Sequence, residues 1–210
     1  MTEKTTRLSV FPLGGAILFP RMQLPLHIFE PRYRALVSDA MARDRRIGMI
    51  QPKAGGEPPP LFDIGCIGRI AHVEALEDGR YNIVLEGVSR FRVLRELDVT
   101  TPFRQLEVSL EGFEGDSDER ALAIAERAAL EIEARRFADV QGYAVDWEAV
   151  TRLDDESLVN GIAQIAPFDV AAKQALLEAP DIAARCELIV QLMQFFGRHH
   201  GGDDEGVTLQ

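Results

Sequence analysis

Residues that could carry out catalysis are sparse in this sequence. The three lysines are Lys4, Lys53 and Lys173, and none of them follows a glycine-rich turn, so no G-x-x-x-x-G-K-S/T loop is present to hold nucleotide phosphates. No G-x-S-x-G motif is present to expose a serine nucleophile. The lysines fall in a polar tail, a loop and an acidic helical surface, where a desolvated base for a serine is not expected. The sequence therefore predicts that the chain is not an enzyme of either kind.

Histidine and cysteine residues do not group into a site either. His27 stands between two apolar residues, which is typical of a half-buried histidine bonded to a backbone carbonyl. Cys66 and Cys186 lie far apart and lack the spacing of metal ligands, so we expect two free buried thiols. The pair His199-His200 precedes a glycine- and aspartate-rich tail, where fixed geometry is not expected. We expect no catalytic residue, no metal site and no cofactor.

An apolar, proline-containing run spans Phe11 to Val37. Its prolines at 12, 20 and 25 stand at spacings that neither a helix nor a central strand accepts, since each removes an amide donor and fixes φ. We therefore expect short extended pieces separated by turns. The run offers more apolar surface than a short barrel edge needs, and the candidates for an exposed apolar patch that binds unfolded segments are Phe19, Pro20, Met22, Leu24 and Pro25. The alternative, which each residue taken singly favours because Phe and Leu are buried by default, is that these side chains plug a barrel and pack against Tyr33.

A helix is predicted to begin after Glu30, with Pro31 at its first position, where proline is well tolerated. The run through this helix, FPLGGAILFPRMQLPLHIFEPRYRALV, resembles the opening of the N-terminal, substrate-recognition domain of the Lon ATP-dependent proteases. The similarity continues through a strand at 47–50, DIGCIGRI at 63–70 and GRYNIVLEGVSRF at 79–91. It covers the chain from about residue 8 to the late 190s.

The resemblance implies a PUA-like (pseudouridine-synthase-and-archaeosine-transglycosylase-like) barrel and a role in binding polypeptides. Lon proteases also carry an ATPase and a serine–lysine peptidase, whose motifs this sequence lacks, so we expect a recognition domain that stands alone and is not catalytic. Unfolded or damaged polypeptide segments are the expected partners. An adaptor in protein quality control that passes them to a protease or chaperone is a further hypothesis, and so is a homo-oligomer, because Lon N-terminal domains associate in their larger assembly.

The rest of the chain divides into strands and then helices. Strands are expected at 64–75, 81–85, 90–99 and 103–110, with Glu86-Gly87 ending one of them and glycines marking bulges or corners. After a boundary at 111–117, about four helices follow; Asp116 is expected to cap the first, which carries an apolar stripe that includes Ile124 and Ile132. We predict an α+β chain with a PUA-like β-barrel subdomain and one inserted helix at 1–114, a helical subdomain at 115–197 and a flexible acidic tail at 198–210.

Charge separates the two halves of the chain. The net charge is −11, with +3 in residues 1–105 and −14 in residues 106–210, so the second half repels phosphate backbones and nucleic acid is disfavoured as a partner. The alternative function is RNA binding by a basic face of the N-terminal half, formed by Arg21, Arg32, Tyr33 and Arg34. The sequence has neither a signal-peptide core nor an apolar run of the roughly 20 residues that span a bilayer, so we expect a cytoplasmic protein without membrane contact.

Overall fold

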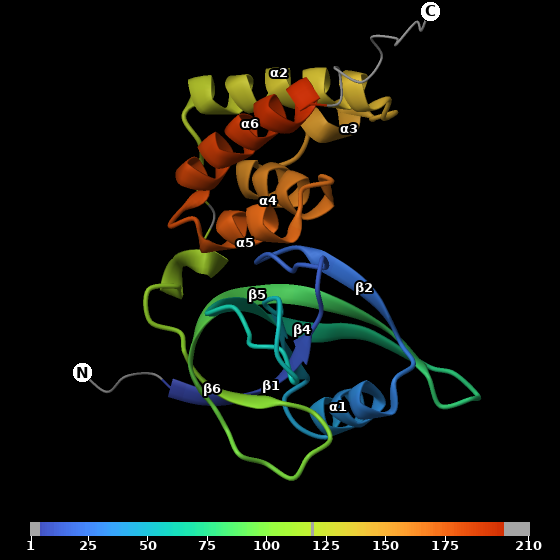
Figure 1. Cartoon of the computed structure of the whole chain (residues 1–210). Coiled ribbons are helices and arrows are strands. Elements are labelled where there is room, and N and C mark those ends of the chain that lie inside the picture. The colour runs from blue at the N-terminus through green and yellow to red at the C-terminus, as the bar shows by residue number, and fades with distance from the viewer. Residues whose placement is uncertain (1–4, 119, 200–210) are drawn as a thin grey trace, which may run out of the picture. The chain divides into compact units, whose positions relative to one another are not determined.

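The computed structural model describes residues 5–118 and 120–199, and the chain forms two compact units, Met1–Asp118 and Glu119–Gln210 (Figure 1). We call them the β unit and the helical unit. The β unit contains β1 (Thr5–Pro12), β2 (Gln23–Ile28), α1 (Pro31–Met41), β3 (Arg46–Ile50), β4 (Ile64–Ala75), β5 (Tyr81–Glu96), β6 (Gln105–Ser109) and the 3-10 helix η1 (Glu114–Ser117). The helical unit contains α2 (Ile124–Gln141), α3 (Trp147–Thr151), α4 (Asp155–Ile165), α5 (Val170–Glu178) and α6 (Ile182–His199).

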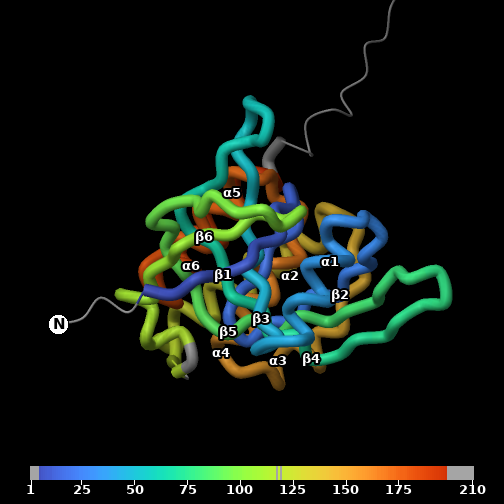
Figure 2. Tube along the Cα trace, turned by 90° about the horizontal axis from the view of Figure 1, so that it is seen from below, coloured from blue at the N-terminus to red at the C-terminus, as the bar shows by residue number. Residues whose placement is uncertain are grey.

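The six strands form one mixed sheet in the order β2-β5-β4-β3-β1-β6. β1 and β3 are parallel, and the other pairs are antiparallel. The 16-residue β5 pairs with β2 and β4 and then, over its last residues, with β6, so the sheet closes on itself (Figure 2). β2 remains attached at the outer edge of this ring, which is where a strand tolerates Pro25. The fold is α+β, and its closed mixed sheet is less regular than the predicted barrel.

Gly87 does not end a strand as predicted, because β5 runs through it. The register between β4 and β5 shifts between Ile67 and Gly68, so Gly87 lies at a bulge. There the loop before β2 packs backbone to backbone: the Arg21 amide donates to the Gly87 carbonyl (2.8 Å) and the Gly87 amide donates to the Met22 carbonyl (2.8 Å). A Cβ on Gly87 would lie 2.0 Å from the Phe19 carbonyl oxygen. Glycine therefore fixes the path of this loop and does not break the strand.

The core of the β unit lies inside the closed sheet. It is formed by buried apolar residues from β1, β3, β4, β5 and β6: Leu8, Val10, Ile50, Ile67, Phe91, Leu106 and Val108. α1 begins at Pro31 as predicted and buries Tyr33, Leu36, Val37 and Ala40. α1 contacts β1 and β3 through this face.

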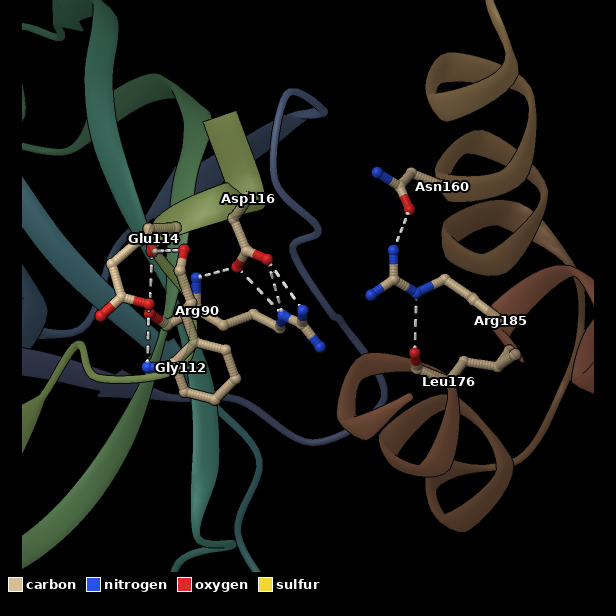
Figure 3. A network of polar contacts seen from close by, with 9 residues as sticks. Arg90, Gly112, Glu114, Asp116, Asn160, Leu176 and Arg185 are labelled. Carbon is tan, nitrogen blue, oxygen red and sulfur yellow. Dashed lines mark hydrogen bonds and ion pairs between the residues drawn. The ribbon is translucent and has the colours of Figure 1, made fainter. Parts of the chain in front are cut away.

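Asp116 has a different role from the predicted one, because it lies in η1 and binds Arg90 of β5 (Figure 3). Its carboxylate accepts hydrogen bonds from the Arg90 amide (2.8 Å), Nε (3.0 Å) and Nη2 (2.8 Å), and both side chains are buried. The Arg90 guanidinium also lies 4.8 Å from the centre of the Phe113 ring. This ion pair fastens η1 to the sheet within the β unit.

Five helices make up the described part of the helical unit, one more than predicted, because α3 was not anticipated. α2 and α6 run side by side, and α4 and α5 pack on α6 (Figure 1). α2 begins at Ile124, where Glu126 accepts a hydrogen bond from the Ala123 amide at 2.9 Å. None of the helices within residues 5–118 and 120–199 is long and apolar enough to cross a membrane.

The predicted inward face of α2 was wrong. Ile124 and Ile132, on the predicted stripe, are 91% and 68% exposed, whereas Leu130, Ala134 and Phe137 are buried. The remainder of the predicted stripe is alanine, so it offers less apolar area than the opposite face, and the helix buries the face that removes more apolar surface from water. α6 extends to His199, beyond the predicted start of the tail, and residues 200–210 lie outside the described residues.

Candidate functional site

The five residues of the predicted apolar patch differ in how far they are buried. Phe19 is 0% exposed and Pro20 is also buried, so neither can contribute to an exposed patch. The backbone contacts at Gly87 hold both residues in the interior. Met22 and Leu24 are half-buried and Pro25 is exposed, so these three stay candidates for a contact surface.

The aromatic residue of the predicted basic face, Tyr33, is buried and cannot contribute to a surface. Tyr33 is 6% exposed, its hydroxyl donates to the Pro12 carbonyl (3.3 Å), and its ring centre lies 4.0 Å from that of Phe11. Burial raises the pKa of the Tyr33 hydroxyl. Arg32 forms an ion pair with Glu30 at 2.9 Å. A base therefore cannot stack on Tyr33, and Arg21, Arg32 and Arg34 would have to bind RNA without it.

His27 is exposed, unlike the half-buried histidine that the sequence predicted. Its Nδ1 lies 2.7 Å from Oδ1 of Asn82, and its Nε2 lies 3.2 Å from Nη1 of Arg80. An amide oxygen accepts and a guanidinium donates, so Nδ1 carries the proton and Nε2 accepts. This contact pattern holds the imidazole against β5 and needs no substrate to explain it.

The two thiols are free and buried as predicted. Burial is the main reason that the pKa of Cys186 rises to about 11, and the charges of Glu126 and Asp155 raise it further. Such a thiol is a poor nucleophile and a poor metal ligand. Among the residues that the structure describes, no three His, Cys, Asp or Glu side chains gather closely enough to hold a metal ion.

An apolar pocket of about 500 Å³ lies in the helical unit. It is bounded by the last turns of α2, the connection to α3, α3 itself, α4, and the link between α4 and α5, with one residue of α6. Its lining is predominantly apolar and includes Phe137, Tyr143, Val145, Trp147, Leu153 and Ile165. This volume falls within the range of ligand-binding cavities in proteins.

Local sequence signals set the helix ends that surround this pocket. Gly142 adopts φ +71° and ends α2, and the Tyr143 amide donates to the Ala138 carbonyl at 2.9 Å. Asp146 caps α3 by accepting a hydrogen bond from the Ala149 amide (3.0 Å). Asp154 caps α4 in the same way through the Ser157 amide (3.0 Å), and Pro167 follows the end of α4.

Large apolar side chains at the pocket remain in contact with water. Ile165 is 79% exposed, and Tyr143, Val145 and Leu153 are each more than one-third exposed. Isolated exposed apolar residues are ordinary, but a group of them around a concave apolar surface indicates a binding site. Sequence reasoning missed this pocket because Tyr143, Val145 and Trp147 fall in a stretch without helical periodicity.

Buried polar contacts brace the helices around the pocket. The buried Arg185 of α6 donates from Nε to the Leu176 carbonyl of α5 (2.8 Å) and from Nη1 to Oδ1 of Asn160 in α4 (2.6 Å; Figure 3). Arg127 of α2 donates to Asp155 in the first turn of α4, and this hydrogen bond is the main reason that the pKa of Arg127 rises. These contacts join α2, α4, α5 and α6 and favour a pocket that exists before a ligand binds.

Comparison with known proteins assigns the chain to a family. The family model of the ATP-dependent protease La (LON) substrate-binding domain matches residues 7–194. The chain is 30% identical over 192 residues to Lon protease 1 of Syntrophobacter fumaroxidans, which covers 87% of this chain and 23% of that protein. It is 27% identical over 199 residues to Lon protease 2 of Myxococcus xanthus, which covers 89% of this chain and 23% of that protein.

Solved structures agree in fold. A Lon N-terminal domain protein from Xanthomonas campestris superposes with a TM-score of 0.66 at 23% sequence identity, over 90% of this chain and 98% of that one. The N-terminal domain of a Mycobacterium avium complex Lon protease gives a TM-score of 0.66 at 18% identity over the same shares. The chain spans about a quarter of the length of the curated relatives above, and the matching family model describes a substrate-binding domain and not a catalytic module. This chain belongs to the family of Lon substrate-binding domains.

Proposed function

We propose that this chain is a non-catalytic recognition module that binds unfolded or damaged polypeptide segments through exposed apolar surface. The observation that supports this proposal most directly is the apolar pocket of the helical unit, with exposed large side chains at its border. Unfolded segments differ from folded proteins chiefly in presenting apolar side chains to water. Membership in a substrate-binding family supports the same role.

The size of the pocket sets the expected strength of binding. A pocket of about 500 Å³ accommodates one or two large apolar side chains and not a whole folded surface. Burying one such side chain contributes about 1.5–3 kcal/mol. We therefore expect weak binding of a single site and tighter binding of clients that present several apolar segments, with Met22, Leu24 and Pro25 as a candidate second contact surface.

We further propose that the chain acts as an adaptor. An adaptor role in protein quality control would need a protease or chaperone to receive the bound polypeptide. The cytoplasmic location and the homo-oligomer stay predictions. RNA binding remains the alternative function, and burial of Tyr33 removes the stacking residue on which it relied.

The test is fluorescence anisotropy with two labelled probes, a permanently unfolded polypeptide and a single-stranded RNA. We expect saturable binding of the polypeptide that survives moderate salt and is weakened by Leu153→Asp combined with Ile165→Asp. Ile132→Asp is the matched control, because Ile132 is also exposed but does not line the pocket. Salt-sensitive binding of RNA alone would overturn the proposal. Equal loss of polypeptide binding in the control variant would contradict the assignment of the pocket.

A further inference from the structure

Acidic residues flank the pocket-lining residues in the sequence. Asp139, Asp146, Asp154 and Asp169 are exposed, and each lies within two residues of a pocket-lining residue in the sequence. Asp146, Asp154 and Asp169 accept hydrogen bonds from helix amides. Exposed carboxylates therefore flank the apolar lining along the chain, although none of the four aspartates is itself a lining residue.

Positive side chains near the pocket are already engaged. Arg152 pairs with Glu148, and Arg136 pairs with Glu133 at 3.6 Å. The Arg135 guanidinium lies 4.5 Å from the centre of the Trp147 ring. Across the helical unit, 17 acidic residues stand against 8 basic ones, which gives −9 of the net −11. The net charge of the helical unit is therefore strongly negative, although one cation, Arg135, contacts the pocket-lining Trp147.

We propose, resting on the function proposed above, that the pocket takes an apolar residue flanked by lysine or arginine and selects against acidic segments. The apolar side chain enters the pocket while the flanking cations are attracted to the exposed carboxylates that neighbour the lining residues in the sequence. Each exposed ion pair contributes little, so the charges select among apolar segments and do not replace the apolar contact. The substrate class is a basic, apolar polypeptide segment.

Charge also disfavours two other occupants of the pocket. The end of this chain carries Asp203, Asp204 and Glu205 beside Val207 and Leu209, so its apolar residues have acidic neighbours. A second copy of the helical unit would bring another net charge of −9. Like charges at close range oppose both contacts, whereas a basic segment is attracted.

Trp147 provides a direct probe, because it is the single tryptophan of the chain and lines the pocket. We would titrate the whole protein with three tryptophan-free peptides that share a Leu-Phe-Leu core and carry Lys-Lys, Ser-Ser or Glu-Glu on both sides. Trp147 fluorescence reports occupancy of the pocket, and anisotropy of a dye on the peptide reports binding anywhere. We expect about tenfold tighter binding of the lysine peptide than of the glutamate peptide at low salt, and convergence of the two at high salt.

Variants distinguish the charge effect from the apolar contact. Asp139→Asn with Glu148→Gln is expected to reduce the lysine preference, because Asp139 and Glu148 each stand next to a pocket-lining residue in the sequence. Glu187→Gln is the control, since Glu187 is exposed in the same unit but is not within two residues of any residue that lines this pocket. Equal affinity for the three peptides would overturn the charge selection and leave polypeptide recognition intact. Anisotropy changes without a Trp147 response would place the site elsewhere and overturn the inference. Absence of binding in both signals, with the unfolded polypeptide also unbound, would overturn the proposed function itself.

A tail-deleted variant that gains affinity for all three peptides would show that the tail occupies the pocket, which would contradict the charge argument.

Discussion

A buried ion pair, Arg90–Asp116, fastens η1 to the sheet of the β unit. Asp116 supplies the carboxylate that neutralises the buried Arg90 and also accepts its amide hydrogen bond. A buried charge that loses its partner is far more costly than an exposed one, because water cannot replace the lost contacts. The Arg90–Asp116 pair is therefore the ion pair to test first.

Asp116→Ala is expected to lower the free energy of unfolding by about 3–5 kcal/mol, because Arg90 is left buried without its carboxylate. Urea unfolding followed by circular dichroism measures this change. The matched control is Asp44→Ala, which also removes a carboxylate that accepts an amide hydrogen bond (from Arg46, 3.1 Å) and pairs with the same residue's guanidinium (4.0 Å), but at an exposed position where the loss should be less than about 1 kcal/mol. Similar losses in the two variants would mean that burial does not strengthen the Arg90 contact.

The raised pKa of the Cys186 thiol predicts that the stability of the folded chain depends on pH. Its pKa is raised in the folded chain to about 11, above an unfolded value near 8.5, so the unfolded chain releases this proton first. Folded stability is therefore expected to fall as pH rises from about 9 to about 11. The measurement is the urea midpoint at several pH values in this window. Cys186→Ala should show a shallower fall, and an identical pH profile in the variant would refute this assignment.

At the scale of elements, the sequence predicted the helix ends that depend on local backbone chemistry. It did not predict features that depend on how elements pack against one another. Pro31, Asp154 and Pro167 mark helix ends by their own backbone chemistry, so the sequence located these boundaries well. The inward face of α2 depends on which of two apolar stripes buries more area against other helices, and the sequence alone does not show those partners. The connection from Gly142 to Asp146 has no periodicity, so its part in the pocket could not be predicted.

Gly87 shows that a contact with residues distant in the sequence can overrule the strand break that a glycine predicts locally. Glycine within a strand often marks a break, yet here it permits the Phe19 carbonyl to approach β5. Gly87→Ala is expected to destabilise the chain by about 1–3 kcal/mol, since a methyl group 2.0 Å from that oxygen forces the loop outward. Thermal unfolding compares this variant with Gly14→Ala, where the nearest atom to the new Cβ lies 3.8 Å away. Equal melting temperatures would exclude the close approach.

The two units differ in kind at the scale of the whole molecule. The β unit has a net charge of −2, and it offers Met22, Leu24 and Pro25 as contact candidates. The helical unit has a net charge of −9 and contains the apolar pocket. A polypeptide that contacts both units would gain from linked binding, so variants in each unit can separate the two contributions.

Paired variants in the two units test which surface recognises polypeptide. Met22→Asp with Leu24→Asp alters the β unit, and Leu153→Asp with Ile165→Asp alters the pocket. We expect the pocket variant to lose the Trp147 response and most of the affinity for a short apolar peptide, because a carboxylate replaces apolar contact in the pocket. The β-unit variant should keep the Trp147 response and lose affinity only for long unfolded chains, which can reach both surfaces. Retention of peptide affinity in the pocket variant, together with its loss in the β-unit variant and with unchanged circular dichroism in both, would transfer recognition to the loop and strand β2.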